Sequence, residues 1–320
     1  MVTSLAVTAG TGRKMVEMEL VTATNVAAAV LALAPYLAVA FWGSAIKARV
    51  QALPAWAQIT APALLCAPYI LVAAGAGILQ WQWLALYSAL PVAIAALLRW
   101  AKPAGGHAEA EEQTQNSEPF AWRELAVLAV LGLAVDLRWF ERAWPAHLAI
   151  FNKVLLLDAG IYGFVLLRDL GGTGFDLRLR WRDLATGLRE TVFYVPIALA
   201  LGLSLGFLHL HNAWPGLAPI AGAWVFTFFF IAVPEELFFR GWLQNLLERK
   251  LGRNTALLVT AALFGLAHFN KRTTFFNWRY VLLAAVAGIF YGRAWRRDRR
   301  VGASAVTHAT VDAIWSLWLK

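Results

Sequence analysis

About ten stretches of the chain are apolar over a length close to that of a membrane-spanning helix, which is about 20 residues. Only 15% of the 320 residues are charged and 60% are hydrophobic, whereas soluble domains carry about 25% charged residues. A water-soluble globule cannot bury this much apolar surface. We therefore expect an all-α, polytopic integral membrane bundle of about ten spans, or eight if the two shortest stretches do not cross. The stretches are residues 21–46, 55–80, 82–99, 121–136, 146–168, 190–210, 218–246, 254–269, 279–294 and 302–319.

The composition also excludes several classes of protein. Soluble enzymes and disordered proteins are too polar to match it. The single cysteine, Cys66, rules out an internal disulfide framework and a cysteine-type zinc site. The first apolar stretch is longer than the apolar core of a signal peptide and is followed by further spans, so we interpret it as a membrane helix.

The distribution of basic residues predicts the orientation. With the N-terminus outside, roughly two thirds of the Lys and Arg residues fall on the cytoplasmic side, as the positive-inside rule requires. The net charge of +9 is then mostly cytoplasmic, so anionic lipids are the expected partners and nucleic acid is not. The Ala-, Arg- and Trp-rich composition is typical of a bacterium with a GC-rich genome, which predicts the inner (plasma) membrane.

A change in composition suggests a domain boundary. Residues 101–120 are polar, acidic and interrupted by Pro and Gly, as in a flexible linker. They separate an N-terminal extension, residues 1–100, with about three spans, from a core at residues 121–320. Because the three leading spans contain almost no ionisable side chains, we look for chemistry in the core.

Two adjacent glutamates lie in the seventh apolar stretch. Ionisable groups inside a membrane cost roughly 2.5–3.5 kcal/mol each on insertion scales, so each needs a reason. Glu236 and Arg240 are four residues apart and can form a pair on one helix face. Glu235 is rotated by about 100° and is less well placed to join that pair. We expect Pro234 to kink this helix. The pattern predicts a structural role for Glu236 and Arg240 and leaves Glu235 available, although a purely structural charge cluster is the alternative.

Two histidines and an aspartate follow at a similar depth. Phe264 and His268 share one face of the eighth stretch, and His308 and Asp312 share one face of the tenth. Counted along the helices at 1.5 Å per residue, these groups and Glu235 lie about 12–21 Å from the predicted cytoplasmic ends. They can therefore converge, although a single buried histidine is more often a satisfied polar residue.

A buried glutamate beside a histidine suits the activation of water, because burial strengthens a carboxylate as a base. A second histidine can donate to a developing oxyanion. Two His, a Glu and an Asp are also donors that zinc accepts, so metal-free and metal-assisted hydrolysis both stay open. The HExxH zinc motif is absent. Ser304 lies near the expected start of a helix, where it is interpreted as a cap.

Three motifs in order, Glu235-Glu236-x-x-x-Arg240, Phe264-x-x-x-His268 and His308-x-x-x-Asp312, resemble those of the CPBP (Abi) family of intramembrane proteases, the type II CaaX prenyl endopeptidases. The stretch from Phe290 to Arg293 is also reminiscent of this family, and the resemblance covers residues 121–320. It implies a helical membrane protease in which Glu235 and His268 activate water. It further implies that His308 and the residue at position 312 stabilise the oxyanion, with Glu236 and Arg240 in support and no bound metal. Many members have Asn at the last position; Asp312 cannot donate unless it is protonated, so it is expected to orient His308 or to support a metal.

From these observations we expect an intramembrane endopeptidase that cleaves a membrane-associated or lipidated protein or peptide. The sequence fixes neither the substrate nor the oligomeric state. The competing hypothesis is a non-enzymatic protein, a membrane scaffold or a bacteriocin-immunity partner, that uses the same polar cluster for binding.

Overall fold

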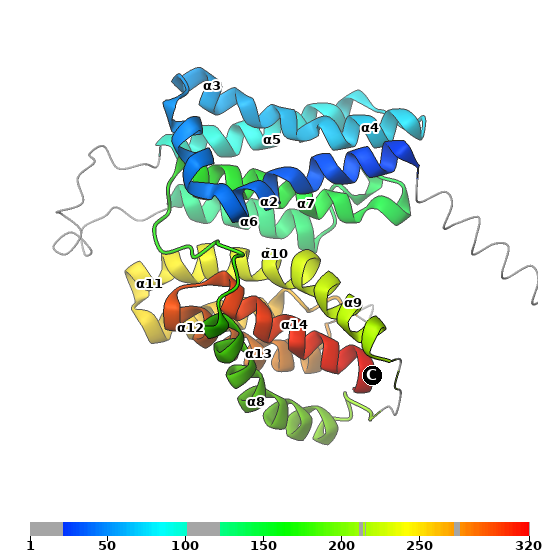
Figure 1. The fold of residues 1–320 in the computed structure, drawn as a ribbon, viewed down its shortest axis with the longest axis vertical. Coiled ribbons are helices and arrows are strands. Elements are labelled where there is room, and N and C mark those ends of the chain that lie inside the picture. The colour runs from blue at the N-terminus through cyan, green and yellow to red at the C-terminus, as the bar shows by residue number, and fades with distance from the viewer. Residues whose placement is uncertain (1–21, 101–121, 211–213, 215, 272–275, 320) are drawn as a thin grey trace, which may run out of the picture. The chain divides into compact units, whose positions relative to one another are not determined.

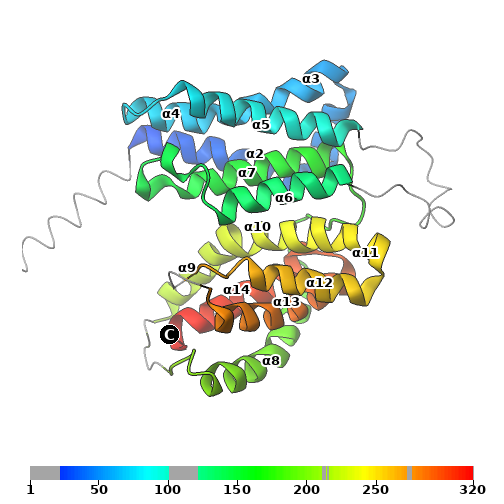
Figure 2. The same ribbon diagram turned by 180° about the vertical axis from the view of Figure 1, so that it is seen from behind.

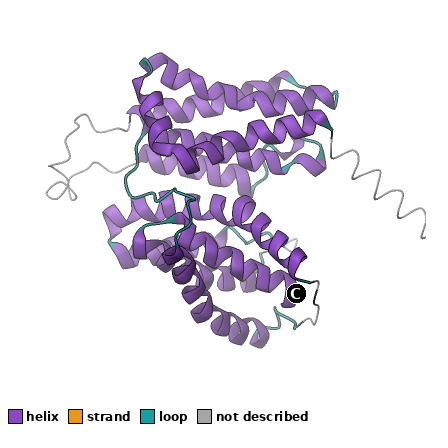
Figure 3. Ribbon diagram, in the orientation of Figure 1, coloured by secondary structure: helices purple, strands orange, loops and turns teal. Residues whose placement is uncertain are grey.

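The described part of the chain consists of helices joined by turns and loops, and it contains no strand (Figure 3). The structure is a computed structural model that describes residues 22–100, 122–210, 214, 216–271 and 276–319. Helices lie at all ten places where the apolar stretches predict spans (Figure 1). The prediction of an all-α, polytopic membrane protein is confirmed. The expected linker at residues 101–120 falls outside the described residues.

Six helical segments in the described parts of the chain are long and apolar enough to cross a membrane. Four predicted spans fall short of that standard for visible reasons. Two of them, Trp122–Asp136 and Arg253–Leu266, have only 15 and 14 residues. The other two, Trp278–Asp298 and Val301–Trp318, carry charged or polar side chains that lower their hydropathy. The six segments are Ala23–Ala52, Ala55–Gly75, Trp81–Trp100, Ala146–Leu167, Trp181–Ser204 and Leu217–Leu251.

The first of two compact units contains the leading spans together with residues 129–169. This division differs from the expected boundary near residue 121, which assigns residues 129–169 to the core. Buried polar contacts link the two parts, since Tyr87 donates to Asn152 Oδ1 at 2.9 Å and Trp144 Nε1 donates to the Tyr87 hydroxyl at 2.6 Å. The helices of the first unit are α2 (Ala23–Ala52), α3 (Ala55–Thr60), η1 (Ala61–Cys66), α4 (Ala67–Gly75), α5 (Trp81–Trp100), the end of α6 (Trp122–Asp136), η2 (Glu141–Ala143), η3 (Ala146–Leu148), α7 (Ile150–Ile161) and η4 (Tyr162–Leu167).

The second compact unit contains every residue singled out for chemistry. In it α14 packs against α8, α13 and α10, and both ribbon views place α14 between α10 and α8 (Figures 1 and 2). Its helices are α8 (Trp181–Ser204), α9 (Leu217–Thr227), η5 (Phe228–Ala232), α10 (Val233–Glu236), η6 (Leu237–Gln244), α11 (Asn245–Leu251), α12 (Arg253–Leu266), α13 (Trp278–Asp298) and α14 (Val301–Trp318).

The helical segment that carries the two glutamates is irregular around them. Both η5 and η6 are π-helical, and the short α10 between them holds Pro234, Glu235 and Glu236. Pro234 lacks a backbone N–H, and the N–H of Val233 donates to the Phe228 carbonyl five residues back, which widens the turn before the proline. Wide turns of this kind are frequent at functional sites because they redirect side chains. The expected local disturbance at Pro234 thus takes the form of π-helical turns.

Helix α8 begins earlier than the apolar stretch at 190–210 indicates. It starts at Trp181, so Arg182 and Arg189 lie on the helix and not in a loop. The backbone N–H of Arg180 donates to Asp183 Oδ2 at 2.8 Å, which stabilises this polar first turn. Hydropathy identifies only the apolar part of such a helix.

Helices α12 and α13 approach each other at two glycines. A Cβ on Gly265 would lie 2.5 Å from the carbonyl oxygen of Val281, and one on Gly288 would lie 3.0 Å from the Cα of Ala261. Small residues at helix contacts permit this close backbone approach in membranes. The approach brings Phe264 of α12 beside Tyr291 of α13.

Candidate active site

The Glu236 carboxylate lies at the centre of a buried polar cluster. It is 0% exposed and is contacted from two helices. Arg240 Nη1 donates to its Oε1 at 2.9 Å, and His308 Nδ1 lies 2.8 Å from the same oxygen. The Ser304 hydroxyl donates to Oε2. Because both carboxylate oxygens are occupied, Glu236 is placed to position its neighbours.

Arg240 is as deeply buried as Glu236 and has aromatic as well as polar partners. Its Nη2 donates to the Gly288 carbonyl at 3.0 Å. The guanidinium carbon lies 4.5 Å from the centre of the Phe264 ring and 5.4 Å from that of Tyr291. A guanidinium over an aromatic face is stabilised by the ring quadrupole. The expected pairing of Glu236 with Arg240 is present and is enclosed by aromatic rings.

The His308 ring is fixed in orientation. Its plane stacks on Tyr291 with 4.6 Å between ring centres and an angle of 18°. Since Nδ1 is held by Glu236, Nε2 faces two further carboxylates, at 4.0 Å from Glu235 Oε2 and 3.6 Å from Asp312 Oδ2. An ionised carboxylate only accepts hydrogen bonds. The ring therefore suits its surroundings best with Nδ1–H directed to Glu236 and an N–H at Nε2 directed to the other two carboxylates.

His268 is held so that its Nε2 can accept a proton, whereas Nε2 of His308 is placed to donate one. Its Nδ1 lies 2.8 Å from the Phe264 carbonyl, which can only accept, so Nδ1 carries the proton and Nε2 of a neutral ring carries the lone pair. The side chain is buried between aromatic rings, at 4.9 Å from the centres of both Phe264 and Tyr280. The ring is electrostatically coupled to Glu235 and His308. His268 thus offers a base, whereas His308 offers a donor.

Two carboxylates are the more accessible members of the group. The side chains of Glu235 and Asp312 are 29% and 37% exposed, whereas that of His308 is 4% exposed. A water molecule or a peptide bond can reach the cluster only where side chains are exposed. Glu235 and Asp312 therefore mark its accessible edge.

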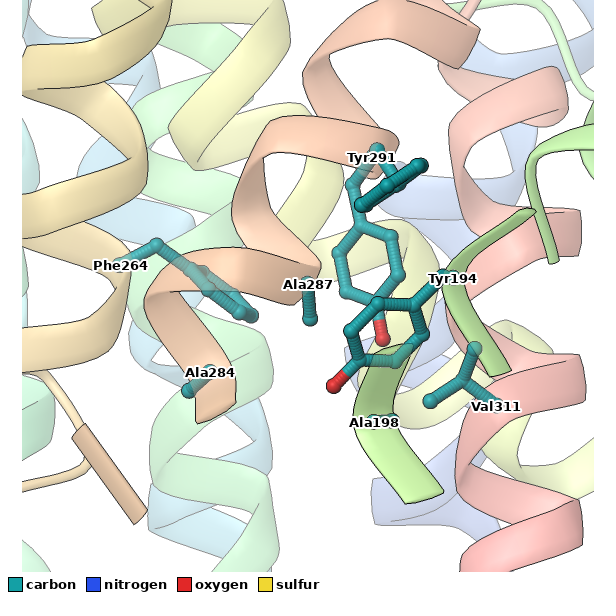
Figure 4. Packing of buried hydrophobic residues seen from close by; sticks show 8 residues of the cluster. Tyr194, Ala198, Phe264, Ala284, Ala287, Tyr291 and Val311 are labelled. Carbon is teal, nitrogen blue, oxygen red and sulfur yellow. The ribbon is translucent and has the colours of Figure 1, made fainter. Parts of the chain in front are cut away.

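An aromatic layer from three helices supports the cluster. Buried Tyr194 of α8 lies beside Tyr291 of α13, and Phe264 of α12 lies 5.7 Å from Tyr291 between ring centres (Figure 4). The Tyr194 hydroxyl donates to the Leu283 carbonyl at 3.1 Å, which fixes α8 against α13. This packing holds the rings on which His308 and Arg240 rest.

Two sequence interpretations need correction. Ser304 is not a helix cap: α14 begins at Val301, and Ser304 is fully buried and donates to Glu236 and to the Tyr291 carbonyl. Its spacing of four residues from His308, on one helix face, was the available signal. His268 lies in the turn after α12, which ends at Leu266, and not within the helix. His268 still contacts Phe264, four residues earlier, because its ring Nδ1 lies 2.8 Å from the Phe264 carbonyl oxygen.

Tyr291 is a site residue that the sequence analysis did not single out by itself. It stacks on His308, accepts from Ser304 through its carbonyl oxygen and lies against Arg240. The only signal was its place inside the stretch from Phe290 to Arg293.

Within the described ranges, no group of three or more His, Cys, Asp or Glu side chains is placed to hold a metal ion. The Nδ1 atoms of both histidines are engaged by oxygen acceptors, which leaves Nε2 as the ring nitrogen that faces other groups.

A comparison with protein families matches the part of the chain that contains this cluster. Residues 217–314 match the family described as type II CAAX prenyl endopeptidase, Rce1-like. The expected resemblance is confirmed, and the Rce1-like segment contains all six predicted site residues, from Glu235 to Asp312. No curated protein and no solved structure matches the chain. The chain is an integral membrane protein with a segment of CaaX-protease type.

Proposed function

We propose that the chain is an intramembrane endopeptidase that hydrolyses a peptide bond of a membrane-associated or lipidated protein or peptide. One observation carries the proposal: the Glu235 carboxylate lies 4.0 Å from Nε2 of His308, which can donate, and interacts electrostatically with His268, which can accept a proton. The match of residues 217–314 to the Rce1-like family model supports it.

In the proposed reaction, Glu235 and His268 Nε2 orient a water molecule and Glu235 takes its proton as the oxygen attacks the carbonyl carbon. The carbonyl oxygen becomes an oxyanion, which accepts a hydrogen bond from His308 Nε2–H. When the C–N bond breaks, the proton on Glu235 passes to the leaving amine, and a carboxylic acid and an amine result. Glu235 is then again a carboxylate.

The remaining polar residues act through His308. Glu236 accepts from Nδ1 and fixes the ring, while Arg240 neutralises Glu236 and Ser304 occupies its second oxygen. Asp312 lies 3.6 Å from Nε2. Its negative charge helps to orient the Nε2–H of the ring, because a carboxylate cannot itself donate to an oxyanion. These four are positioning residues.

The test compares protein termini by mass spectrometry in membranes from cells that express the wild type or Glu235→Gln at matched levels. New termini that occur with the wild type and disappear with the variant are expected, and their sequences identify the substrate. Glu141→Gln in the first compact unit is the matched control and keeps the new termini. If all three membranes have the same termini in a cell that supplies lipidated and membrane proteins, the cluster instead serves a scaffold or an immunity protein.

We also propose that the protein lies in a bacterial inner membrane with its N-terminus outside, as the basic residues suggest. A single cysteine at Arg297, in a Cys66→Ser background, tests this orientation because Arg297 is exposed. An impermeant maleimide is expected to label Arg297→Cys only after the membrane is opened. Labelling in intact cells would reverse the orientation.

A further inference from the structure

A cleft lies on the face of α14 that points away from the proposed site. It has a volume of about 430 Å³ and runs between α8, α9 and α14. This is within the roughly 300–1,000 Å³ of small-molecule sites. It is lined mainly by Trp181, Ala185 and Leu188 of α8, Trp224 of α9, and Val306 and Thr310 of α14.

The walls of the cleft suit a hydrocarbon chain. The polar side-chain atoms that α9 and α14 contribute are satisfied within the protein, since Trp224 Nε1 donates to Thr310 Oγ1 at 3.1 Å and Thr310 donates to the Val306 carbonyl at 2.7 Å. No lining side chain is charged. A polar ligand would gain no new hydrogen bond from the satisfied walls, whereas an apolar chain fills the space at no such cost.

One end of the cleft is strongly basic. Trp181 lies at the start of α8, is 81% exposed and has exposed arginines on both sides, Arg180 and Arg182. On the helix surface these two arginines are one turn from Leu184 and Ala185 of the cleft wall. Tryptophan is enriched at the level of lipid headgroups, and basic residues there attract anionic lipids.

Most arginines further along the chain are occupied inside the protein and do not compete for such a headgroup. Arg296 and Arg299 donate to Glu248 at 2.7 Å, and Arg300 donates to Asp183 at 2.9 Å. These pairs fix the connection between α13 and α14. The exposed positive charge beside the cleft is that of the α8 start.

From this combination we infer that the cleft binds an anionic glycerophospholipid, with an acyl chain between α8, α9 and α14 and the phosphate beside Arg180 and Arg182. This site is separate from Glu235 and His268, and the inference does not rest on the proposed reaction. Val306 and Thr310 flank His308 along α14, so the bound chain packs against the back of the helix that carries His308.

The test uses the full-length protein in nanodiscs of equimolar phosphatidylglycerol and phosphatidylcholine, followed by native mass spectrometry of retained lipid. The wild type is expected to retain phosphatidylglycerol preferentially. Arg180→Gln with Arg182→Gln is expected to reduce this preference at least about fivefold. Ala185→Trp, which fills the cleft, is expected to remove the retained lipid.

Two matched controls separate the site from general surface effects. Arg49→Gln with Arg253→Gln removes the same charge from other exposed positions, and Ala262→Trp adds the same bulk at an exposed position of α12; both keep the wild-type preference. An equal loss in the charge control overturns the inference, as does retention of phosphatidylglycerol by Ala185→Trp. If Ala185→Trp keeps the lipid and loses only proteolysis, the cleft takes the substrate and not a phospholipid.

Discussion

Replacing Arg240 by methionine is expected to lower the free energy of unfolding by about 3–5 kcal/mol, because it leaves the Glu236 carboxylate buried without its cation. Both side chains are 0% exposed, and the Arg240–Glu236 distance is 2.9 Å. The substitution also removes the donor to the Gly288 carbonyl. Denaturation of the purified protein in mixed micelles measures the change.

The double variant Glu236→Gln with Arg240→Met distinguishes pairing from simple loss of packing. Removing both charges avoids an isolated buried ion, so the double variant is expected to be more stable than Arg240→Met alone. The exposed pair of Arg138 and Glu141, at 3.8 Å with Arg138 74% exposed, is the control. Arg138→Met is expected to cost less than about 1 kcal/mol. A double variant no more stable than Arg240→Met would show that the buried pair does not govern stability here.

The helices were predictable from the sequence because apolar length is a local property. The start of α8 was not, since its first turn contains Arg182 and Asp183 and is stabilised by a hydrogen bond from Arg180. The grouping of residues 129–169 with the first unit depends on tertiary contacts such as that of Tyr87 with Asn152, which are 65 residues apart. No local pattern encodes such a contact.

The candidate site was likewise predictable only in part from the sequence. The i, i+4 spacings of Glu236 with Arg240 and of His308 with Asp312 are visible in the sequence, and both pairs are close in the structure. Ser304 was misinterpreted because its partner Glu236 is 68 residues away on another segment. What the sequence alone could not supply is the rotation of each helix about its axis. That rotation decides which side chain of a polar face meets which partner.

Glu235→Gln is expected to slow peptide-bond hydrolysis by about 10²–10⁴-fold, the usual contribution of a general base. Glutamine has nearly the shape of glutamate but cannot take a proton from water. Because Glu235 is 29% exposed and lies outside the Arg240 pair, the free energy of unfolding is expected to change by less than about 0.5 kcal/mol. Initial rates on a peptide spanning the cleavage site found in membranes, with kcat and KM separated, measure the first effect.

The neighbouring glutamate supplies the sharpest control, since the same chemical change one position along the chain has a different predicted result. Glu236→Gln leaves Arg240 buried and uncompensated, so it is expected to lower stability and activity together. Glu235→Gln lowers kcat alone, because the residue is proposed to act on water in the transition state and not to hold the fold. If Glu235→Gln loses less than about tenfold in kcat, Glu235 is not the base. If it destabilises as much as Glu236→Gln, the two glutamates form one structural cluster, and the assignment of catalysis to Glu235 fails.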